Sequence, residues 1–170
     1  MEALLVIDMI NDFLKEDGAL VCGDARKIVP FVRRKIEEFH RQGQLVVFIC
    51  DAHREDDLEF RVFPRHSVKG TEGSRIISEL PVGPGDPIVE KTRYSAFYKS
   101  TLEKTLLEHQ IDRVNVVGVC TSICIMDTVG DLRNRDYPVV VYRDGVADFD
   151  PEAHLFSLRR MERTYGAKVV

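Results

Sequence analysis

The sequence predicts a doubly wound α/β fold, in which a mostly parallel sheet lies between two layers of helices. Short, continuously apolar runs recur along the chain, as is typical of strands buried on both faces, and segments of helical periodicity separate several of them. Strands that alternate with helices of this length favour a parallel sheet with right-handed crossovers. With 170 residues, 44% of them hydrophobic, the chain is expected to form one domain over residues 1–170.

Six apolar runs are the expected strands, and three periodic segments are the expected helices. The strands are predicted at residues 3–7, 45–50, 87–89, 114–119, 139–142 and 167–170. The helices are predicted at residues 25–42, 100–109 and 121–135. The first helix has one apolar stripe and a plausible stop at Gly43; the stripe consists of Ile28, Val29, Val32, Ile36 and Phe39.

The segment from residue 54 to residue 80 is expected to be a long functional loop. It is rich in charge, glycine and proline, and its only helical pattern is a short one at residues 74–79. Loops of this length inside a compact domain commonly carry binding residues. We therefore expect part of the functional site to lie on it.

Composition excludes several classes of protein. The formal net charge of -4 and the absence of a basic run argue against a nucleic-acid partner. No apolar stretch approaches the roughly 18 to 20 residues of a membrane helix, and the first residues lack the features of a signal peptide. The four cysteines show neither paired spacing nor the density of a disulfide scaffold, so free thiols are expected. These features favour a cytoplasmic enzyme.

Polar residues follow the apolar runs at the points where ligands bind in open parallel sheets. Asp8 follows the first strand, Asp51 and His53 the second, Lys91 the third, and the segment 120–124 the fourth. Because the carboxyl ends of parallel strands meet at one edge, these side chains are expected to lie close together.

Cys124 is the candidate nucleophile among them. It lies in the first turn of a predicted helix that Thr121 or Ser122 can cap, where the helix dipole and a nearby Lys91 would lower the thiol pKa. Taken alone, Cys124 is more simply a small buried hydrophobe, Asp8 a capping residue and Lys91 a surface charge. Together they supply the nucleophile, base and cation that acyl transfer needs.

Three segments resemble the signature stretches of the isochorismatase-like cysteine hydrolases. They are residues 7–13, 89–97 and 117–124, and the likeness extends from about residue 3 to at least residue 145. The resemblance implies a catalytic triad of Asp8, Lys91 and Cys124. It also implies an oxyanion hole formed by the backbone amides of Cys120 and Cys124, a cis peptide bond between Val119 and Cys120, and hydrolysis through a thioester.

A second group of residues resembles the metal site of the nicotinamidase and pyrazinamidase type within this family. Asp51-x-His53 precedes His66, which stands in a Pro-x-His-x-x-x-Gly-Thr-x-Gly pattern at residues 64–73. The resemblance implies that Asp51, His53 and His66 bind a divalent ion, either zinc, iron or manganese. Without the resemblance, a capping Asp and two solvated loop histidines would be the slightly favoured explanation of the pattern. Glu59 is the expected fourth ligand; because the loop is short, Asp57 or Glu55 are alternatives.

The same resemblance predicts the substrate and the walls of its pocket. A bound ion can hold the pyridine nitrogen of nicotinamide with its carboxamide over the thiol. Phe13, Phe63 and Tyr94 match the aromatic positions, although core packing would also explain them. Two departures are Phe63, where the family often has Trp, and Ser122, where it usually has Asp or Asn. The implied activity is hydrolysis of nicotinamide or pyrazinamide, which belongs to NAD salvage.

Two alternatives remain open. A related cysteine hydrolase would act on a carbamoyl or ureido compound or on isochorismate, and an anionic substrate would require an arginine in the pocket, for which Arg54, Arg65 and Arg93 are candidates. The second alternative is a non-enzymatic binding module of the same fold. The absence of a glycine-rich phosphate loop after the first strand argues against a nucleotide site in such a module. The expected partner is a small-molecule amide, and we expect a homo-oligomer.

Overall fold

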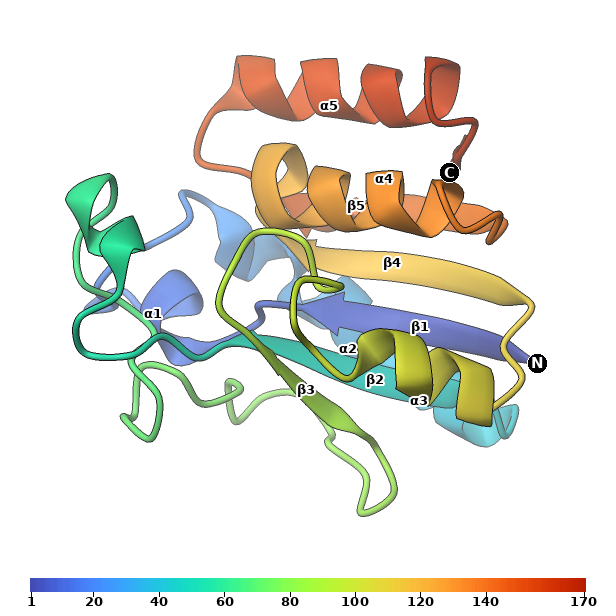
Figure 1. Ribbon diagram of the computed structural model, residues 1–170, viewed down its shortest axis with the longest axis horizontal. Coiled ribbons are helices and arrows are strands. Elements are labelled where there is room, and N and C mark those ends of the chain that lie inside the picture. Colours follow the sequence, from blue (N-terminus) through green and yellow to red (C-terminus); the bar gives the residue numbers. More distant parts are fainter.

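Six strands form one parallel sheet in the order β3-β2-β1-β4-β5-β6 (Figure 1). The computed structural model describes residues 1–170. Strand order reverses on either side of β1, as the doubly wound prediction requires. The strands are β1 (Glu2–Ile7), β2 (Leu45–Asp51), β3 (Ile88–Lys91), β4 (Arg113–Val119), β5 (Val139–Ala147) and β6 (Lys168–Val169).

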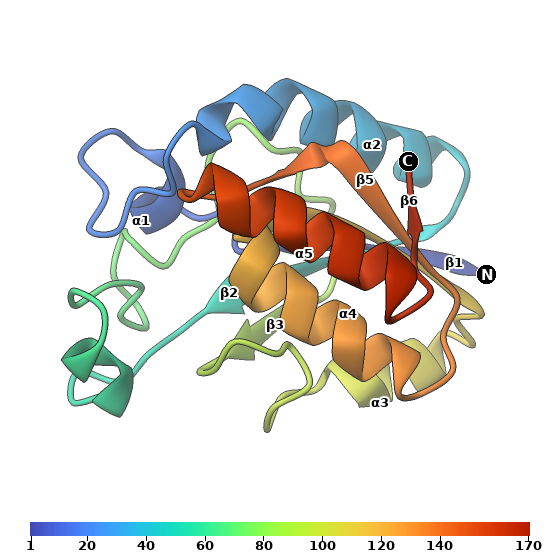
Figure 2. The same ribbon diagram turned by 90° about the horizontal axis from the view of Figure 1, so that it is seen from above.

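Helices cover both faces of the sheet, so the predicted three-layer α/β architecture is confirmed. Helix α2 lies on one face, and α3, α4 and α5 lie on the other (Figure 2). The α-helices are α1 (Asn11–Leu14), α2 (Val29–Arg41), α3 (Leu102–Glu108), α4 (Met126–Arg133) and α5 (Pro151–Arg163). Short turns of other helix types are η1 (Ala25–Ile28), η2 (Leu58–Arg61) and the π-helical turn η3 (Thr121–Ile125). None of the helices is both long and apolar enough to span a membrane.

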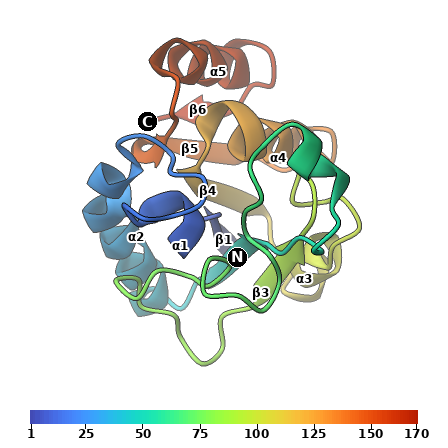
Figure 3. The ribbon, with the colours of Figure 1, turned by 90° about the vertical axis from the view of Figure 1, so that its left-hand side faces the viewer.

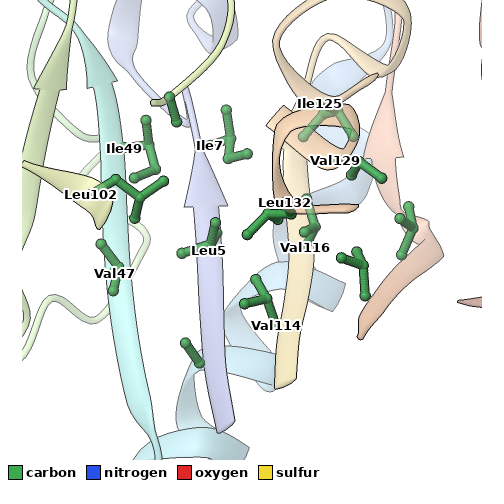
Figure 4. Close-up of a cluster of buried hydrophobic side chains, with 14 of the residues drawn as sticks. Leu5, Ile7, Val47, Ile49, Leu102, Val114, Val116, Ile125, Val129 and Leu132 are labelled. Carbon is green, nitrogen blue, oxygen red and sulfur yellow. The ribbon is translucent and has the colours of Figure 1, made fainter. Parts of the chain in front are cut away.

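The two layers of the core follow from the alternation of side chains along the strands. In β1, Leu5 and Ile7 point to the face covered by α3 and α4, whereas Leu4 and Val6 point to the face covered by α2. Figure 4 shows part of the first layer, in which side chains of β1, β2 and β4 pack against α3 and α4. Its labelled members are Leu5, Ile7, Val47, Ile49, Leu102, Val114, Val116, Ile125, Val129 and Leu132.

The three predicted helices are present, although two of them begin with a turn of another helix type, and the short helix predicted in the loop is absent. The segment 25–42 begins as the turn η1 before α2, and the segment 121–135 begins as the π-helical turn η3 before α4. Residues 74–79 contain no helix, so that prediction was wrong; Ile76 pairs with Ile10, and Ile77 N–H donates to Met9 O, so the middle of the segment lies along residues 9–10 between two turns. Helix α5 was missed, although Asp150 followed by Pro151 is a helix-start signal that the structure uses as a cap.

The carboxyl ends of the strands face one side of the molecule, and the long loops gather there (Figure 3). At this edge β4 approaches β1 very closely: a Cβ on Gly118 would lie 2.0 Å from the Ile7 carbonyl oxygen. Gly118 also has a φ of +123°, a conformation that only glycine adopts readily. The residues that follow β1 and β4 are therefore brought together without an intervening side chain.

Candidate active site

The side chains predicted at the strand ends meet in one buried cluster. Asp8 follows β1, Asp51 and Lys91 end β2 and β3, and Cys124 lies in η3 after β4. The sheet register pairs Asp51 directly with Lys91, so their side chains emerge next to each other. All four residues are buried, and an oxygen of each carboxylate and the Cys124 sulfur lie within 4.8 Å of one another.

Asp8 is held in an uncommon backbone conformation at the end of β1. Its φ is +54°, and its N–H donates to Ile49 O at 2.9 Å. One carboxylate oxygen accepts a hydrogen bond from the Asp51 N–H at 2.9 Å. The other lies 2.8 Å from Lys91 Nζ. The carboxylate is thereby fixed between the ends of three strands.

Lys91 is a buried cation with two carboxylate partners and one sulfur partner. Its ammonium forms ion pairs with Asp8 and Asp51 and donates to Cys124 Sγ at 3.4 Å. Burial alone would lower the pKa of Lys91, but the charges of Asp51 and Asp8 outweigh it and raise the pKa well above its usual value. Lys91 therefore stays charged and balances the surrounding negative groups.

The protonation of Cys124 differs from the sequence-based expectation. Burial raises the pKa of Cys124 well above its usual value, although Lys91 acts in the opposite direction, so the expected lowered pKa was wrong. Burial and the charge of Asp51 raise the pKa of Asp8 to about 6. The resting site thus combines a neutral thiol with a carboxylate that can accept a proton near neutral pH.

The turn that carries Cys124 is capped from another loop. Neither Thr121 nor Ser122 caps it; the Thr121 hydroxyl donates to Ala147 O at 3.0 Å. Instead the Ser122 N–H donates to Asp148 Oδ2 at 2.7 Å. The expected Thr or Ser cap was therefore wrong, and Asp148 is a site residue that the sequence reasoning missed.

The peptide bond between Val119 and Cys120 is cis, as the family resemblance implied. The Cys120 side chain lines the same pocket as Cys124. The Cys120 N–H donates to no acceptor in the chain. It is therefore available to a ligand in the pocket.

A second cluster adjoins the first through Asp51. Asp51 Oδ2 lies 3.6 Å from His53 Nε2 and 3.9 Å from His66 Nε2, while its other oxygen pairs with Lys91. Glu59 Oε1 lies 3.9 Å from both imidazole Nε2 atoms. Two nitrogen and two carboxylate donors thus face a common centre, and each of these residues is buried.

The surroundings of the two histidines orient their Nε2 atoms toward this centre. His66 Nδ1 contacts Pro64 O at 2.7 Å, which requires the proton on Nδ1 and leaves Nε2 as a free lone pair. His53 Nδ1 contacts Asp57 Oδ2 at 3.2 Å, while its buried Nε2 has no hydrogen-bond partner. Burial lowers the pKa of His66, which favours the neutral, ligating form. Mixed nitrogen and carboxylate donors of this kind fit a divalent ion such as zinc.

Among the three candidates for a fourth donor, Glu59 lies at the centre. Asp57 contacts the outer nitrogen of His53 and pairs with Arg93, and it also caps η2 by accepting the Glu59 N–H. Glu55 is exposed and pairs with Arg65. Glu59 Oε2 is buried without a hydrogen-bond partner, as a carboxylate awaiting a cation would be.

One pocket joins both clusters and has mainly apolar walls. Phe13, Phe63 and Tyr94, predicted as pocket residues, all line it. Sequence reasoning missed three further apolar residues of the lining, Leu20, Ile123 and Phe149. Only Ile123, which is adjacent to Cys124, carried a signal in the sequence; Leu20 and Phe149 come from loops distant in sequence.

The arginines considered for an anionic substrate do not line this pocket. Arg54 pairs with Asp56 on the surface, Arg65 pairs with Glu55, and Arg93 pairs with Asp57. The charged groups of the lining are Asp51 and Glu59, both acidic. The pocket therefore disfavours an anionic ligand in the absence of a bound cation.

Comparison with known proteins identifies the family to which the chain belongs. Residues 2–170 match the family model described as an isochorismatase domain. The chain belongs to the isochorismatase family. It is an isochorismatase-family hydrolase, so the family resemblance found in the sequence is confirmed.

Three crystal structures illustrate the range of similar proteins. The nicotinamidase/pyrazinamidase PncA from Bacillus subtilis is 37% identical, with a TM-score of 0.94 over 99% of this chain and 98% of that one. The pyrazinamidase of Pyrococcus horikoshii in complex with zinc is 32% identical, with a TM-score of 0.94 over 99% and 98%. The N-carbamoylsarcosine amidase from Thermoplasma acidophilum is 39% identical, with a TM-score of 0.90 over 99% and 94%.

Proposed function

We propose that this protein hydrolyses the carboxamide of nicotinamide or pyrazinamide to the carboxylic acid and ammonia through a thioester on Cys124. The observation that carries the proposal is the pocket itself. It places a buried thiol and base beside a group of metal donors, and it has aromatic walls and no arginine or lysine in its lining. A neutral, flat heteroaromatic amide fits this combination of features.

In this mechanism Asp8 is the general base and then the general acid. As the Cys124 sulfur attacks the amide carbon, Asp8 accepts the thiol proton; it then donates that proton to the amide nitrogen, which leaves as ammonia. The pKa of about 6 suits both roles near neutral pH. A water molecule, deprotonated by Asp8, hydrolyses the thioester and releases the acid.

In this mechanism Lys91 and the Cys120 amide stabilise the negative charges that are present or that form during the reaction. Lys91 holds Asp8 and Asp51 in place and offsets their charge as the thiolate forms. The unpartnered Cys120 N–H, together with the Cys124 N–H, stabilises the oxyanion of the tetrahedral intermediate. Removal of one such donor from a hydrolase typically lowers the rate by about 100- to 1,000-fold.

Asp51, His53, His66 and Glu59 would hold a divalent cation at the far side of the pocket. Their fit rests on the converging Nε2 atoms and on the buried, unpartnered atoms of His53 and Glu59. A bound zinc, iron or manganese ion supplies a coordination position for the heterocyclic nitrogen of the substrate. Phe13, Phe63 and Tyr94 would then hold the substrate ring in a slot between the four metal donors and the thiol.

A carbamoyl compound is the second candidate substrate. The likeness to the N-carbamoylsarcosine amidase at 39% identity favours it, because the thiol chemistry is compatible with cleavage of either amide. The lining argues against it, because substrates of that type carry a carboxylate and the arginines near the pocket are already paired.

An assay of ammonia release separates the two candidates. The zinc-loaded protein is expected to release ammonia from nicotinamide and pyrazinamide but not from N-carbamoylsarcosine, and the release should decrease when a chelator removes the metal. Cys124→Ala should abolish it, whereas Cys50→Ala, which removes another buried thiol, should retain it. Release from N-carbamoylsarcosine alone, or activity in Cys124→Ala, would refute the proposal.

A further inference from the structure

Two cysteines outside the proposed reaction lie in contact beside the pocket. Cys22 Sγ and Cys120 Sγ are 2.9 Å apart, although the residues are separated by 98 positions in the chain. Both are free thiols in the structure. The proposed reaction uses the backbone of Cys120 but neither of these sulfur atoms, so the pair has no assigned role.

The backbone on each side holds the two thiols in this arrangement. Cys22 N–H donates to Phe13 O at 3.0 Å, and Cys22 O accepts the Ala25 N–H at 2.9 Å. Cys120 O accepts the N–H groups of Ile123 and Ile125, at 3.1 and 3.2 Å. The thiols are therefore presented to each other by two anchored segments rather than by flexible ends.

The surrounding loops also bring the two segments together. Gly23 has a φ of +44°, and a Cβ there would lie 3.2 Å from both Asp148 O and Phe149 Cα. The loop that contains Cys22 thus packs directly on the loop whose Asp148 caps the Cys124 turn. A displacement of Cys22 can therefore be transmitted through these packed loops to the turn that carries Cys124.

The two thiols differ in their access to small reagents. Cys22 has an exposed fraction of 0%, whereas Cys120 has one of 9% and forms part of the pocket lining. A small oxidant that enters the pocket therefore reaches Cys120 first. Cys22 is fully buried, and its sulfur contacts that of Cys120.

We propose that Cys22 and Cys120 are a redox-modification site, at which a peroxide of hydrogen-peroxide size converts the two thiols into a disulfide that lowers the activity of the adjacent site. The inference about activity rests on the proposed function; the inference about the bond does not. In the first step the Cys120 sulfur attacks one oxygen of the peroxide and the O–O bond breaks; the thiol proton passes to the departing hydroxide, which leaves as water, and a sulfenic acid remains on Cys120. In the second, the Cys22 sulfur attacks the resulting sulfenic sulfur, and a second water is released as the S–S bond forms. Two thiols are oxidised and one peroxide is reduced.

The disulfide would act through the position of Cys120. An S–S bond is about 2 Å long, so its formation draws Cys120 toward Cys22 and shifts the amide proposed to stabilise the oxyanion. Displacements of about 1 Å in a catalytic arrangement can lower rates by up to roughly 100-fold. We expect a decrease in kcat/KM of about tenfold, reversed by a thiol reductant.

Peptide mapping tests the bond independently of any activity. Trypsin leaves Cys22 in residues 16–26, but it leaves both Cys120 and Cys124 in residues 114–133. The Cys124→Ala variant removes this ambiguity and also removes the nucleophile as a competing target. After treatment with hydrogen peroxide and without reductant, the two peptides should be linked, with the loss of two hydrogen atoms. If they are not linked, the proposal is wrong, whether or not the protein hydrolyses any amide.

Activity measurements test the consequence in the chain that keeps Cys124. Peroxide-treated protein should regain activity with dithiothreitol, whereas Cys22→Ala should have unchanged basal activity and should lack this recoverable component. Cys50→Ala, whose thiol lies in residues 42–54 after digestion, is the matched control and should respond as the unmodified chain does. If the recoverable loss is equal in Cys22→Ala, the role in regulation is refuted.

Discussion

The candidate site has two halves that are built in different ways. The strand-end half consists of Asp8, Asp51, Lys91 and Cys124, which are buried side by side where the strands end. The loop half consists of Glu59, Phe63, His66 and Phe149, which come from the segments after β2 and β5. Its members range from buried His66 to Phe149, which is 43% exposed. The comparison indicates that the sheet fixes the reacting groups, whereas loops determine what is held against them.

Loss of charge balance in the strand-end half is expected to have the largest effect. In Lys91→Met the buried carboxylates of Asp8 and Asp51 lose the ammonium that pairs with both of them, which should lower the free energy of unfolding by about 3 to 5 kcal/mol and abolish ammonia release. Urea denaturation measures the first effect.

A second lysine provides the control for this change. Lys69 is exposed and pairs with Glu90 next to the same strand, so Lys69→Met should cost less than about 1 kcal/mol. If both variants are equally stable, the strand-end half does not depend on its buried ion pairs.

A change in the loop half should instead separate binding from folding. His66→Ala removes one of four converging donors from a loop, so we expect the bound zinc to dissociate at least about 100-fold more readily while the unfolding midpoint changes little. Metal content after dialysis, measured by mass spectrometry, reports the loss. His40→Ala, which removes a histidine paired with Asp86 far from the cluster, should retain full metal content. Full zinc occupancy in His66→Ala would contradict the assignment.

The smallest expected effect lies where a loop supports the strand-end half. Asp148→Ala removes the acceptor for the Ser122 N–H, and loss of a helix cap costs about 1 kcal/mol, which is roughly fivefold in rate. We expect kcat to fall by about that factor with little change in KM. The rate at which iodoacetamide alkylates Cys124 gives a second readout of the turn.

The neighbouring aspartate tests whether this effect is specific. Asp150 caps α5 through the Glu152 and Ala153 N–H groups and does not contact the Cys124 turn. Asp150→Ala should therefore reduce stability by about 1 kcal/mol without changing kcat. An equal fall in kcat in both variants would show that Asp148 acts only on the general stability of the loop.

The strand-end half could be predicted from the sequence because the rule that locates it is simple. Each apolar run ends at a polar residue, and the parallel sheet brings those ends together. Asp8, Lys91 and Cys124 were found in this way, before any family resemblance was considered. The pKa of Cys124 was not predictable, because it depends on how completely the surrounding loops bury the sulfur.

The limits of prediction in the loop half have a specific cause in β5. The apolar pattern stops at Tyr142, but the strand continues through Arg143 and Asp144, and its pairing with β4 is irregular before it resumes at Val146. With the true end at Ala147, the strand-end rule would have pointed to Asp148 and Phe149. The failure to predict Asp148 and Phe149 thus follows from one irregularity in one strand.

Asp51 has a consequence for how sequences of similar proteins are read. One of its oxygens pairs with Lys91, and the other faces the two histidines. A chain that lost its metal ligands would still need a carboxylate here, because Lys91 would otherwise lack one of its two counter-charges. The presence of an aspartate at this position is therefore uninformative about metal dependence, and the two histidines are the diagnostic characters.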